Sequence, residues 1–255
     1  MVYHTISLYL MVARNISLSS FCLISLPLAE ALDTLTKYTQ AVELFNDGRH
    51  YTNDVELLRS YSFDYTVHAP SRSVNVASVL EPIRKASVEL VCESISLAAE
   101  IDATGVVFHP GYYTFEEEYE NAVSALQQSF AEINQFAREV HVPCCVENMG
   151  NWGFFFLKSP ADISLIKSTE FCLDIGHANE CGTLSEYLSV PFSQMHVHDN
   201  DGTADSHLAL GKGTIDIPSV IAAIQRNGNA ALISECATLD DAVATKNTLE
   251  KWLKL

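Results

Sequence analysis

Short apolar runs alternate along the chain with longer stretches whose apolar residues recur at helical spacing. The runs that we expect to form strands cover residues 16–21, 41–45, 64–68, 105–109, 143–147, 171–174, 193–198 and 230–235. The stretches that we expect to form helices cover residues 26–38, 51–61, 81–102, 115–140, 159–168, 183–190, 216–227 and 239–253. Strands that alternate with helices form βαβ units and a parallel sheet. Eight such units favour closure, and the 255 residues match the ~250 that a (β/α)8 barrel needs. We therefore predict the α/β class and one TIM barrel domain over residues 1–255.

Residue types that commonly bind metals lie at the ends of most predicted strands. They are His68, His109, Glu147, Asp174, His196, His198 and Glu235. In a (β/α)8 barrel the carboxyl ends of the strands meet at one mouth, where the active site lies. Because side chains alternate along a strand, Glu147 shares a face with Cys145, and His196 shares one with His198. We expect the acids and imidazoles to converge at this mouth.

A divalent cation is the simplest explanation for carboxylates in this position. An unpaired carboxylate inside a closed barrel is very costly, and the predicted strands contain almost no Lys or Arg. Carboxylates together with imidazoles suit Mn²⁺, Mg²⁺, Co²⁺ or Zn²⁺. Single residues keep other interpretations: His68 as a turn cap, or His198 as a core histidine bonded to a carbonyl. For Glu147 and Glu235 the alternative is a salt bridge to a neighbouring strand.

Composition and charge narrow the class of protein further. The chain is 48% hydrophobic and 18% charged, which suits a compact fold. Its formal net charge of −17 argues against a nucleic-acid partner, because binding phosphates needs Lys and Arg. No apolar stretch is long enough to span a bilayer. Seven cysteines, an odd number without a Cys-x-x-Cys motif, favour reduced thiols and a cytoplasmic location.

The N-terminal segment, residues 1–32, has the Leu, Ile and Ser content of a signal peptide. It lacks a basic start, Arg14 interrupts its apolar stretch, and Ala29-Glu30-Ala31 is a poor cleavage site. We expect no signal peptide, and we expect residues 16–21 to form the first strand instead.

Several short motifs follow one another from the third predicted strand to the eighth. They are Val67-His68-Ala69-Pro70, Phe108-His109-Pro110-Gly111, Val146-Glu147-Asn148, Leu173-Asp174-Ile175-Gly176-His177, Met195-His196-Val197-His198-Asp199-Asn200, Asp205-Ser206-His207, Leu210-Gly211-Lys212-Gly213 and Ser234-Glu235. With these motifs the chain resembles the xylose-isomerase-like (β/α)8 superfamily. That superfamily holds type-IV apurinic endonucleases and many isomerases and epimerases of sugars and sugar phosphates.

The resemblance implies one of two catalytic designs. In epimerase-type members, the positions that match Glu147, Asp174, His196 and Glu235 bind one divalent cation. The two glutamates then act as acid and base on a ketose through an enediolate. Lewis-acid polarisation of the substrate by the metal and proton transfer to a carboxylate make this chemistry coherent.

The endonuclease-type members add two further zinc ions. The resemblance assigns His68 and His109 to one of them, bridged by Glu147, and His177, Asp205 and His207 to the other. All nine positions are present in this chain. One to three ions, Zn²⁺ or Mn²⁺, are therefore expected.

We rank the isomerase or epimerase first, with a small carbohydrate as substrate and with a homo-oligomer left open. The net charge argues against DNA, and so do the loops 46–50 and 71–73, which are short of basic and aromatic residues. A zinc phosphodiesterase of the apurinic-endonuclease type ranks second, and a metal-holding binding module without catalysis third. The acid–base pair of Glu147 and Glu235 argues against that third hypothesis.

Three side chains are candidates for binding substrate rather than metal: His198, Lys212 and Arg72. Lys212 stands where the superfamily usually has Glu. Together with Arg49 and Arg72 it could offer positive charge to a phosphate or carboxylate of a small substrate. The alternative for Lys212 is an ordinary solvated lysine.

Overall fold

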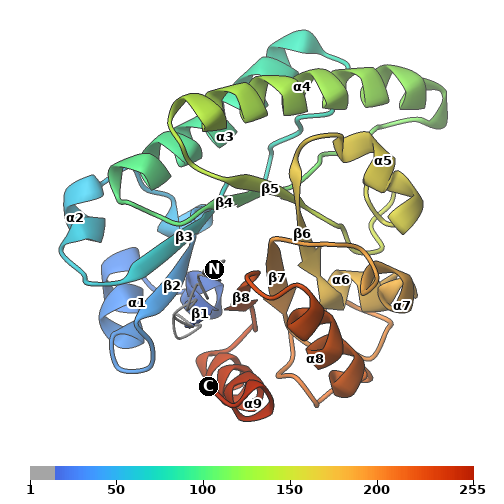
Figure 1. The fold of residues 1–255 in the computed structure, drawn as a ribbon. Coiled ribbons are helices and arrows are strands. Elements are labelled where there is room, and N and C mark those ends of the chain that lie inside the picture. The colour runs from blue at the N-terminus through green and yellow to red at the C-terminus, as the bar shows by residue number, and fades with distance from the viewer. Residues whose placement is uncertain (1–14) are drawn as a thin grey trace, which may run out of the picture.

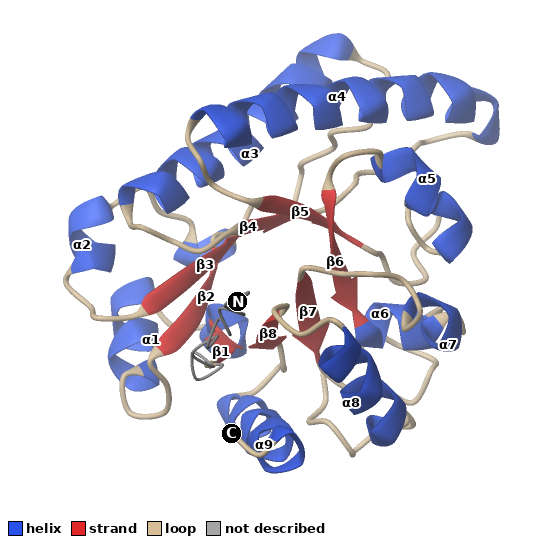
Figure 2. Ribbon diagram, viewed as in Figure 1, coloured by secondary structure: helices blue, strands red, loops and turns tan. Residues whose placement is uncertain are grey.

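Eight parallel strands close into a barrel in the order in which they follow one another along the chain (Figure 2). The computed structural model describes residues 15–255. Residues 1–14, on which part of the signal-peptide expectation falls, lie outside the described residues. The strands are β1 (Ile16–Ser19), β2 (Ala41–Phe45), β3 (Asp64–His68), β4 (Val106–Phe108), β5 (Cys144–Glu147), β6 (Glu170–Asp174), β7 (Gln194–Val197) and β8 (Ala231–Ser234). The predicted α/β class and TIM barrel are confirmed.

The helices form an outer layer around the strands (Figure 1). They are α1 (Leu28–Leu35), α2 (Val55–Arg59), α3 (Glu81–Glu100), α4 (Tyr119–Glu139), α5 (Ile163–Ile166), α6 (Ile175–Glu180), α7 (Leu184–Tyr187), α8 (Ile217–Arg226) and α9 (Leu239–Leu253). The long helices α3 and α4 pack side by side. No helix within residues 15–255 is long and apolar enough to cross a membrane.

Three predicted helices are too long, and one helix was missed. The stretch 183–190 forms only the four-residue α7. The stretch 51–61 forms only the five-residue α2, because the Asp54 side chain accepts a hydrogen bond from Leu57 N and caps the helix there. The stretch 159–168 forms a 3₁₀ turn and the four-residue α5, which ends at Lys167 with φ at +51°. Helix α6 was not predicted. It begins directly after β6, because the carboxylate of Asp174 caps it by accepting from His177 N.

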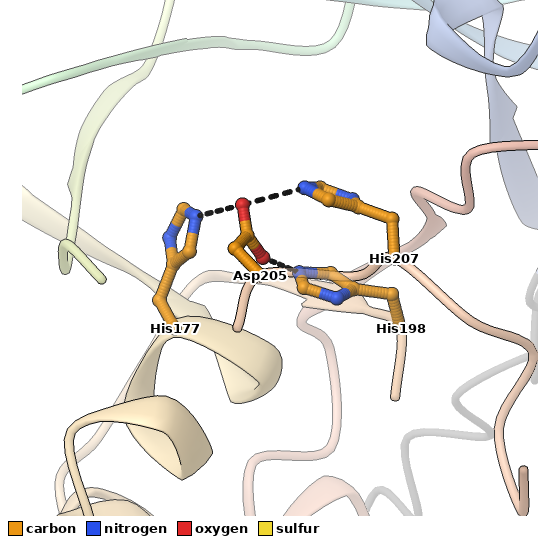
Figure 3. Close-up of side chains that lie close together, drawn as sticks. All are labelled: His177, His198, Asp205 and His207. Carbon is orange, nitrogen blue, oxygen red and sulfur yellow. Dashed lines mark hydrogen bonds and ion pairs between the residues drawn. The ribbon is translucent and has the colours of Figure 1, made fainter. Parts of the chain in front are cut away.

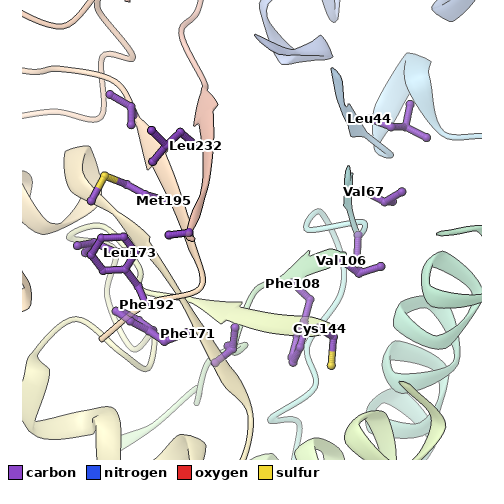
Figure 4. Packing of buried hydrophobic residues seen from close by; sticks show 14 of the residues in the cluster. Leu44, Val67, Val106, Phe108, Cys144, Phe171, Leu173, Phe192, Met195 and Leu232 are labelled. Carbon is purple, nitrogen blue, oxygen red and sulfur yellow. The ribbon is translucent and has the colours of Figure 1, made fainter. Parts of the chain in front are cut away.

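Apolar side chains on the outer face of the strands pack against the helices. Figure 4 labels members of this cluster: Leu44, Val67, Val106, Phe108, Cys144, Phe171, Leu173, Phe192, Met195 and Leu232. Phe108, for example, meets Phe130 of α4 edge to face at 5.7 Å between ring centroids. Inside the barrel, Val107, Cys145 and Cys172 form a separate small apolar cluster. The barrel interior thus combines a small apolar cluster with buried polar side chains such as Glu43 and Gln194.

The long loops at the carboxyl ends of the strands are tied to one another. An isolated bridge joins Tyr112, after β4, to Phe155, after β5. In the loop after β7, Asp199 pairs with Leu208 through two backbone hydrogen bonds of 2.8 Å. These connections give the barrel mouth a defined rim.

Candidate metal centre

Histidine, aspartate and glutamate side chains converge at the carboxyl end of the barrel in three groups. In each group the potential ligand atoms lie within 4.8 Å of one another. The first site consists of His68, His109 and Glu147, and the second of Glu147, Asp174, His196 and Glu235. The third site consists of His177, His198, Asp205 and His207. All nine residues that we predicted as ligands belong to one of these groups, and Glu147 is shared by the first two.

The second site is the most deeply buried. Its four residues are at most 4% exposed. His196 Nδ1 lies 3.3 Å from Glu147 Oε1 and 3.3 Å from Glu235 Oε2. Neither His196 Nδ1 nor the two carboxylate oxygens of Glu147 have a hydrogen-bond partner. Buried polar atoms without partners are costly, and these atoms form a donor set that a divalent cation would satisfy.

The first site lies at the carboxyl ends of β3, β4 and β5. His68 Nε2 is 3.4 Å and His109 Nε2 3.3 Å from the same oxygen, Glu147 Oε2. The two rings face each other edge to face, with centroids 5.0 Å apart. His68 Nδ1 donates to Ala69 O at 2.7 Å, which leaves Nε2 as the nitrogen that can bind an ion. His68 therefore bonds to the turn and also reaches the site.

The third site surrounds Asp205 (Figure 3). Asp205 Oδ2 lies 3.0 Å from His207 Nε2 and 3.5 Å from His177 Nε2, while Oδ1 lies 3.8 Å from His198 Nε2. The other ring nitrogens of two of these histidines are engaged: His177 Nδ1 meets Asn148 O at 3.0 Å, and His207 Nδ1 meets Glu235 O at 2.6 Å. The Nε2 atoms are thus oriented toward a shared point, as in metal sites with outer-sphere support.

Without an ion, protons balance the buried charges. Burial would lower the pKa of His68, but the carboxylate of Glu147, 3.4 Å from its Nε2, raises it to about 9. Burial would raise the pKa of Glu235, but the imidazole of His196 lowers it to about 2. A cation must displace the imidazole protons to bind. Its affinity should therefore increase as the pH rises toward the pKa of His68.

The ring of His198 occupies space that is free because residue 176 is a glycine. A Cβ on Gly176 would lie 1.9 Å from Cε1 of the His198 ring, so only glycine leaves room for the imidazole. The ring stacks on His207 with centroids 3.8 Å apart, and its Nε2 lies 3.1 Å from Asp174 Oδ2. The carbonyl-bonded core histidine, our alternative for His198, is not what the structure contains. Binding of a substrate by His198 stays a prediction.

Replacing Gly176 by Ala should displace His198 and disrupt the third site. Overpacking of this kind costs about 1–3 kcal/mol, and we expect one bound ion fewer per chain. The matched control is Gly153→Ala, because nothing lies within 4 Å of a Cβ at that position. Elemental analysis and thermal unfolding of both variants measure the effect. Equal ion content and equal melting temperatures in the two variants would contradict this account of His198.

Lys212 and Arg72 do not join the ligand groups. Lys212 Nζ forms an ion pair with Asp241 at the start of α9, and its side chain is 59% exposed. Arg72 is exposed in the loop after β3, where its backbone N–H donates to Asp47 Oδ2 at 2.9 Å. Among residues 15–255, no hydrogen bond or ion pair joins either side chain to a candidate ligand. A contact with substrate stays a prediction for both.

Sequence reasoning missed two features of the site. Glu43 in β2 is fully buried, and its Oε2 lies 3.1 Å from His196 Nε2. The sequence could have revealed it, because Glu43 is the single charged residue inside the apolar run 41–45. Aromatic rings also flank the ligands: Trp152 lies 5.2 Å from the ring of His177, and Phe45 lies 5.0 Å from that of His68.

Comparisons with known proteins agree with this fold. The model of the family described as "Xylose isomerase-like TIM barrel" matches residues 40–254. An uncharacterised protein of Methanocaldococcus jannaschii is 34% identical over 197 residues, which cover 74% of this chain and 78% of the relative. A probable endonuclease 4 of Mycobacterium leprae is 25% identical over 202 residues, or 72% and 77% of the two chains.

Among solved structures, a D-tagatose 3-epimerase-like protein is similar over 94% of this chain and 97% of its own, with a TM-score of 0.88 and 26% identity. The matched range of the family model contains every candidate ligand. The chain therefore belongs to the xylose isomerase-like TIM barrel family.

Proposed function

We propose that the protein is a divalent-metal-dependent isomerase or epimerase of a sugar, a sugar phosphate or a related polyol. One observation carries this proposal: the carboxylates of Glu147, at the end of β5, and of Glu235, directly after β8, both lie 3.3 Å from the same nitrogen of His196. Two carboxylates around one point can bind an ion together and still stand on separate sides of a small substrate. Two-base epimerisation needs that arrangement.

In the proposed reaction, the bound cation would polarise the carbonyl and hydroxyl oxygens of the substrate. One glutamate would remove the proton from the hydroxyl-bearing carbon next to the carbonyl, which gives an enediolate. The other glutamate would return a proton to the opposite face of that carbon. His196 and Asp174 would hold the ion in place from β7 and β6. Because the second site is almost fully buried, water would have little access to the reacting carbon.

The rim supports a small carbohydrate as substrate. Trp152, Phe155 and Tyr112 form a chain of contacts, with ring centroids 5.9 Å and 5.1 Å apart, and Trp152 also lies against His177. Trp152 is 39% and Tyr112 37% exposed. Exposed aromatic faces beside a polar centre can pack against the C–H face of a sugar.

The identity of the ions is inferred from the ligand atoms that each site offers. The third site offers three imidazoles and one carboxylate, a set that suits Zn²⁺. The second site offers three carboxylates and one imidazole, which Mn²⁺ or Zn²⁺ can both use. We propose one to three ions, with the second site as the catalytic one.

A zinc phosphodiesterase is the second candidate, and one observation favours it. All nine ligands expected for three clustered ions are assembled, and three ions could stabilise the transition state of a phosphodiester. The relative from M. leprae is a probable endonuclease 4. Against this stands the net charge of −17, which weakens binding to DNA.

Parallel assays of one metal-loaded preparation separate the two candidates. We expect ketoses to be converted to epimers or isomers, detected by chromatography, and abasic duplex DNA to stay intact in a nicked-product assay. A preparation incubated with chelator is the control for both assays. Efficient, chelator-sensitive incision at the abasic site, without turnover of any sugar, would reverse the ranking.

A further inference from the structure

A buried polar triad lies beneath the second site, on the inner side of the barrel. Glu43 Oε2 lies 2.9 Å from Gln194 Nε2 and 3.1 Å from His196 Nε2. The three side chains are at most 4% exposed. Strands β2 and β7 are not neighbours in the barrel, so Glu43 reaches across the interior to meet the two residues of β7.

Packing alone does not account for a carboxylate in this place. Oε1 of Glu43 has no hydrogen-bond partner, and no Lys or Arg within the described part of the chain pairs with Glu43. Placing an ionisable group there is costly unless it is paired. An apolar residue of similar size would avoid that cost, so the carboxylate calls for a role beyond filling space.

The position of the proton on His196 supplies that role. Nδ1 of this ring faces Glu147 and Glu235, where the ion is expected, and Nε2 faces Glu43. An imidazole binds a metal through the nitrogen that carries no proton, and its other N–H is usually held by an acceptor. A carboxylate at Nε2 is such an acceptor.

Because the amide of Gln194 lies beside His196, the carboxylate of Glu43 is needed as a hydrogen-bond acceptor for both groups. Gln194 Nε2 also lies 3.0 Å from His196 Nε2, while its Oε1 faces the thiol of Cys145 at 4.0 Å. Two N–H groups cannot donate to each other, so the arrangement holds only when both donate to Glu43. Without that carboxylate, the amide would donate to Nε2 of the imidazole, and the ring proton would move to Nδ1, where it blocks the ion.

We infer that Glu43 is a positioning residue, which keeps the proton of His196 on Nε2 and so leaves Nδ1 free for the cation of the second site. The inference rests on the proposed function, because it takes the second site to bind a divalent cation. It assigns to Glu43 an effect on ion affinity that operates through His196, without contact between Glu43 and the ion.

The test measures Zn²⁺ affinity in chelator-buffered titrations, with anomalous diffraction to identify the site that is filled. Glu43→Met should weaken binding at the second site by about 10–100-fold, the usual effect of losing an outer partner of a ligand. The first and third sites should keep their ions. The double variant Glu43→Met/Gln194→Met should regain part of this loss, because the competing amide is gone.

Thr66→Val is the matched control. Thr66 pairs with Glu43 in the register of β2 and β3, is buried, and has a hydroxyl without a partner, so its loss should leave the affinity unchanged. If Glu43→Met does not fold, Glu43→Gln with and without Gln194→Met gives the same comparison. In the Zn²⁺-loaded wild type, a protected N–H resonance at His196 Nε2 is also expected.

Two results would overturn the inference. Glu43→Met could bind within about twofold of the wild type, or the double variant could bind more weakly than Glu43→Met, as mere packing would require. A wild type without an ion in the second site would instead overturn the proposed function, and this inference with it. Occupancy in the wild type therefore distinguishes the two failures.

Discussion

Glu147→Gln should lower kcat by at least ~10²–10⁴-fold, the typical contribution of a general acid or base. The amide keeps the shape of the side chain but cannot accept a proton. Glu147 is also the residue shared by the first and second sites, with oxygens 3.3–3.4 Å from His68, His109 and His196. We therefore expect this variant to lose affinity for two ions, and Glu235→Gln, which is equally impaired in turnover, to lose affinity for one.

Glu170→Gln is the matched control for both variants. This variant carries the same Glu-to-Gln substitution at the amino end of β6. Glu170 is exposed there and lies at the end of the strand opposite the barrel mouth. Its activity and ion content should equal those of the wild type. Near-normal turnover in Glu235→Gln, with the ions retained, would show that two-base proton transfer is not the mechanism.

Removing the ions should lower the melting temperature by about 10 °C. A ligand present at 1,000 times its Kd stabilises the folded state by ~4.1 kcal/mol, and each kcal/mol is worth ~2–4 °C in a domain of this size. The physical reason is the set of buried polar atoms that have no hydrogen-bond partner within the protein: Glu147 Oε1 and Oε2, His196 Nδ1 and Asp205 Oδ1.

Thermal unfolding before and after chelation, and again after Zn²⁺ or Mn²⁺ is restored, measures this difference. Glu147→Gln supplies the control. This variant lacks the ligand shared by two sites, so chelation should lower its melting temperature much less. Identical melting temperatures with and without chelator, in wild-type protein shown to contain ions beforehand, would contradict a role of the ions in holding the mouth together.

The barrel was predictable from the sequence because two periodicities alternate eight times. Buried parallel strands are short apolar runs, and the helices between them have one apolar stripe. The errors lie where a side chain rather than a periodicity sets the boundary. The capping carboxylate of Asp174 starts α6 directly after a strand, and the cap at Asp54 shortens α2.

Six of the nine candidate ligands were predictable in kind, since strand parity and strand ends direct them to one mouth. His177, Asp205 and His207 were expected only from the family resemblance. Contacts across the barrel were not, because pairs such as Glu43 and His196 are 153 residues apart and lie on strands that do not touch. Nor does the pattern of Leu-Gly-Lys-Gly reveal that Lys212 pairs with Asp241 of α9. Such partners depend on how strands and loops lie relative to one another in space, which periodicity does not specify.

Solvent hydrogen exchange tests the central claim most directly. Metal-loaded protein is incubated with a panel of ketoses in deuterated water, and the sugars are analysed by NMR and mass spectrometry. The account predicts deuterium on the carbon that bears the exchanging proton, at the rate of turnover, and no incorporation with Glu147→Gln or Glu235→Gln. Turnover of a sugar without any deuterium incorporation, or incision of abasic DNA as the one activity found, would contradict it.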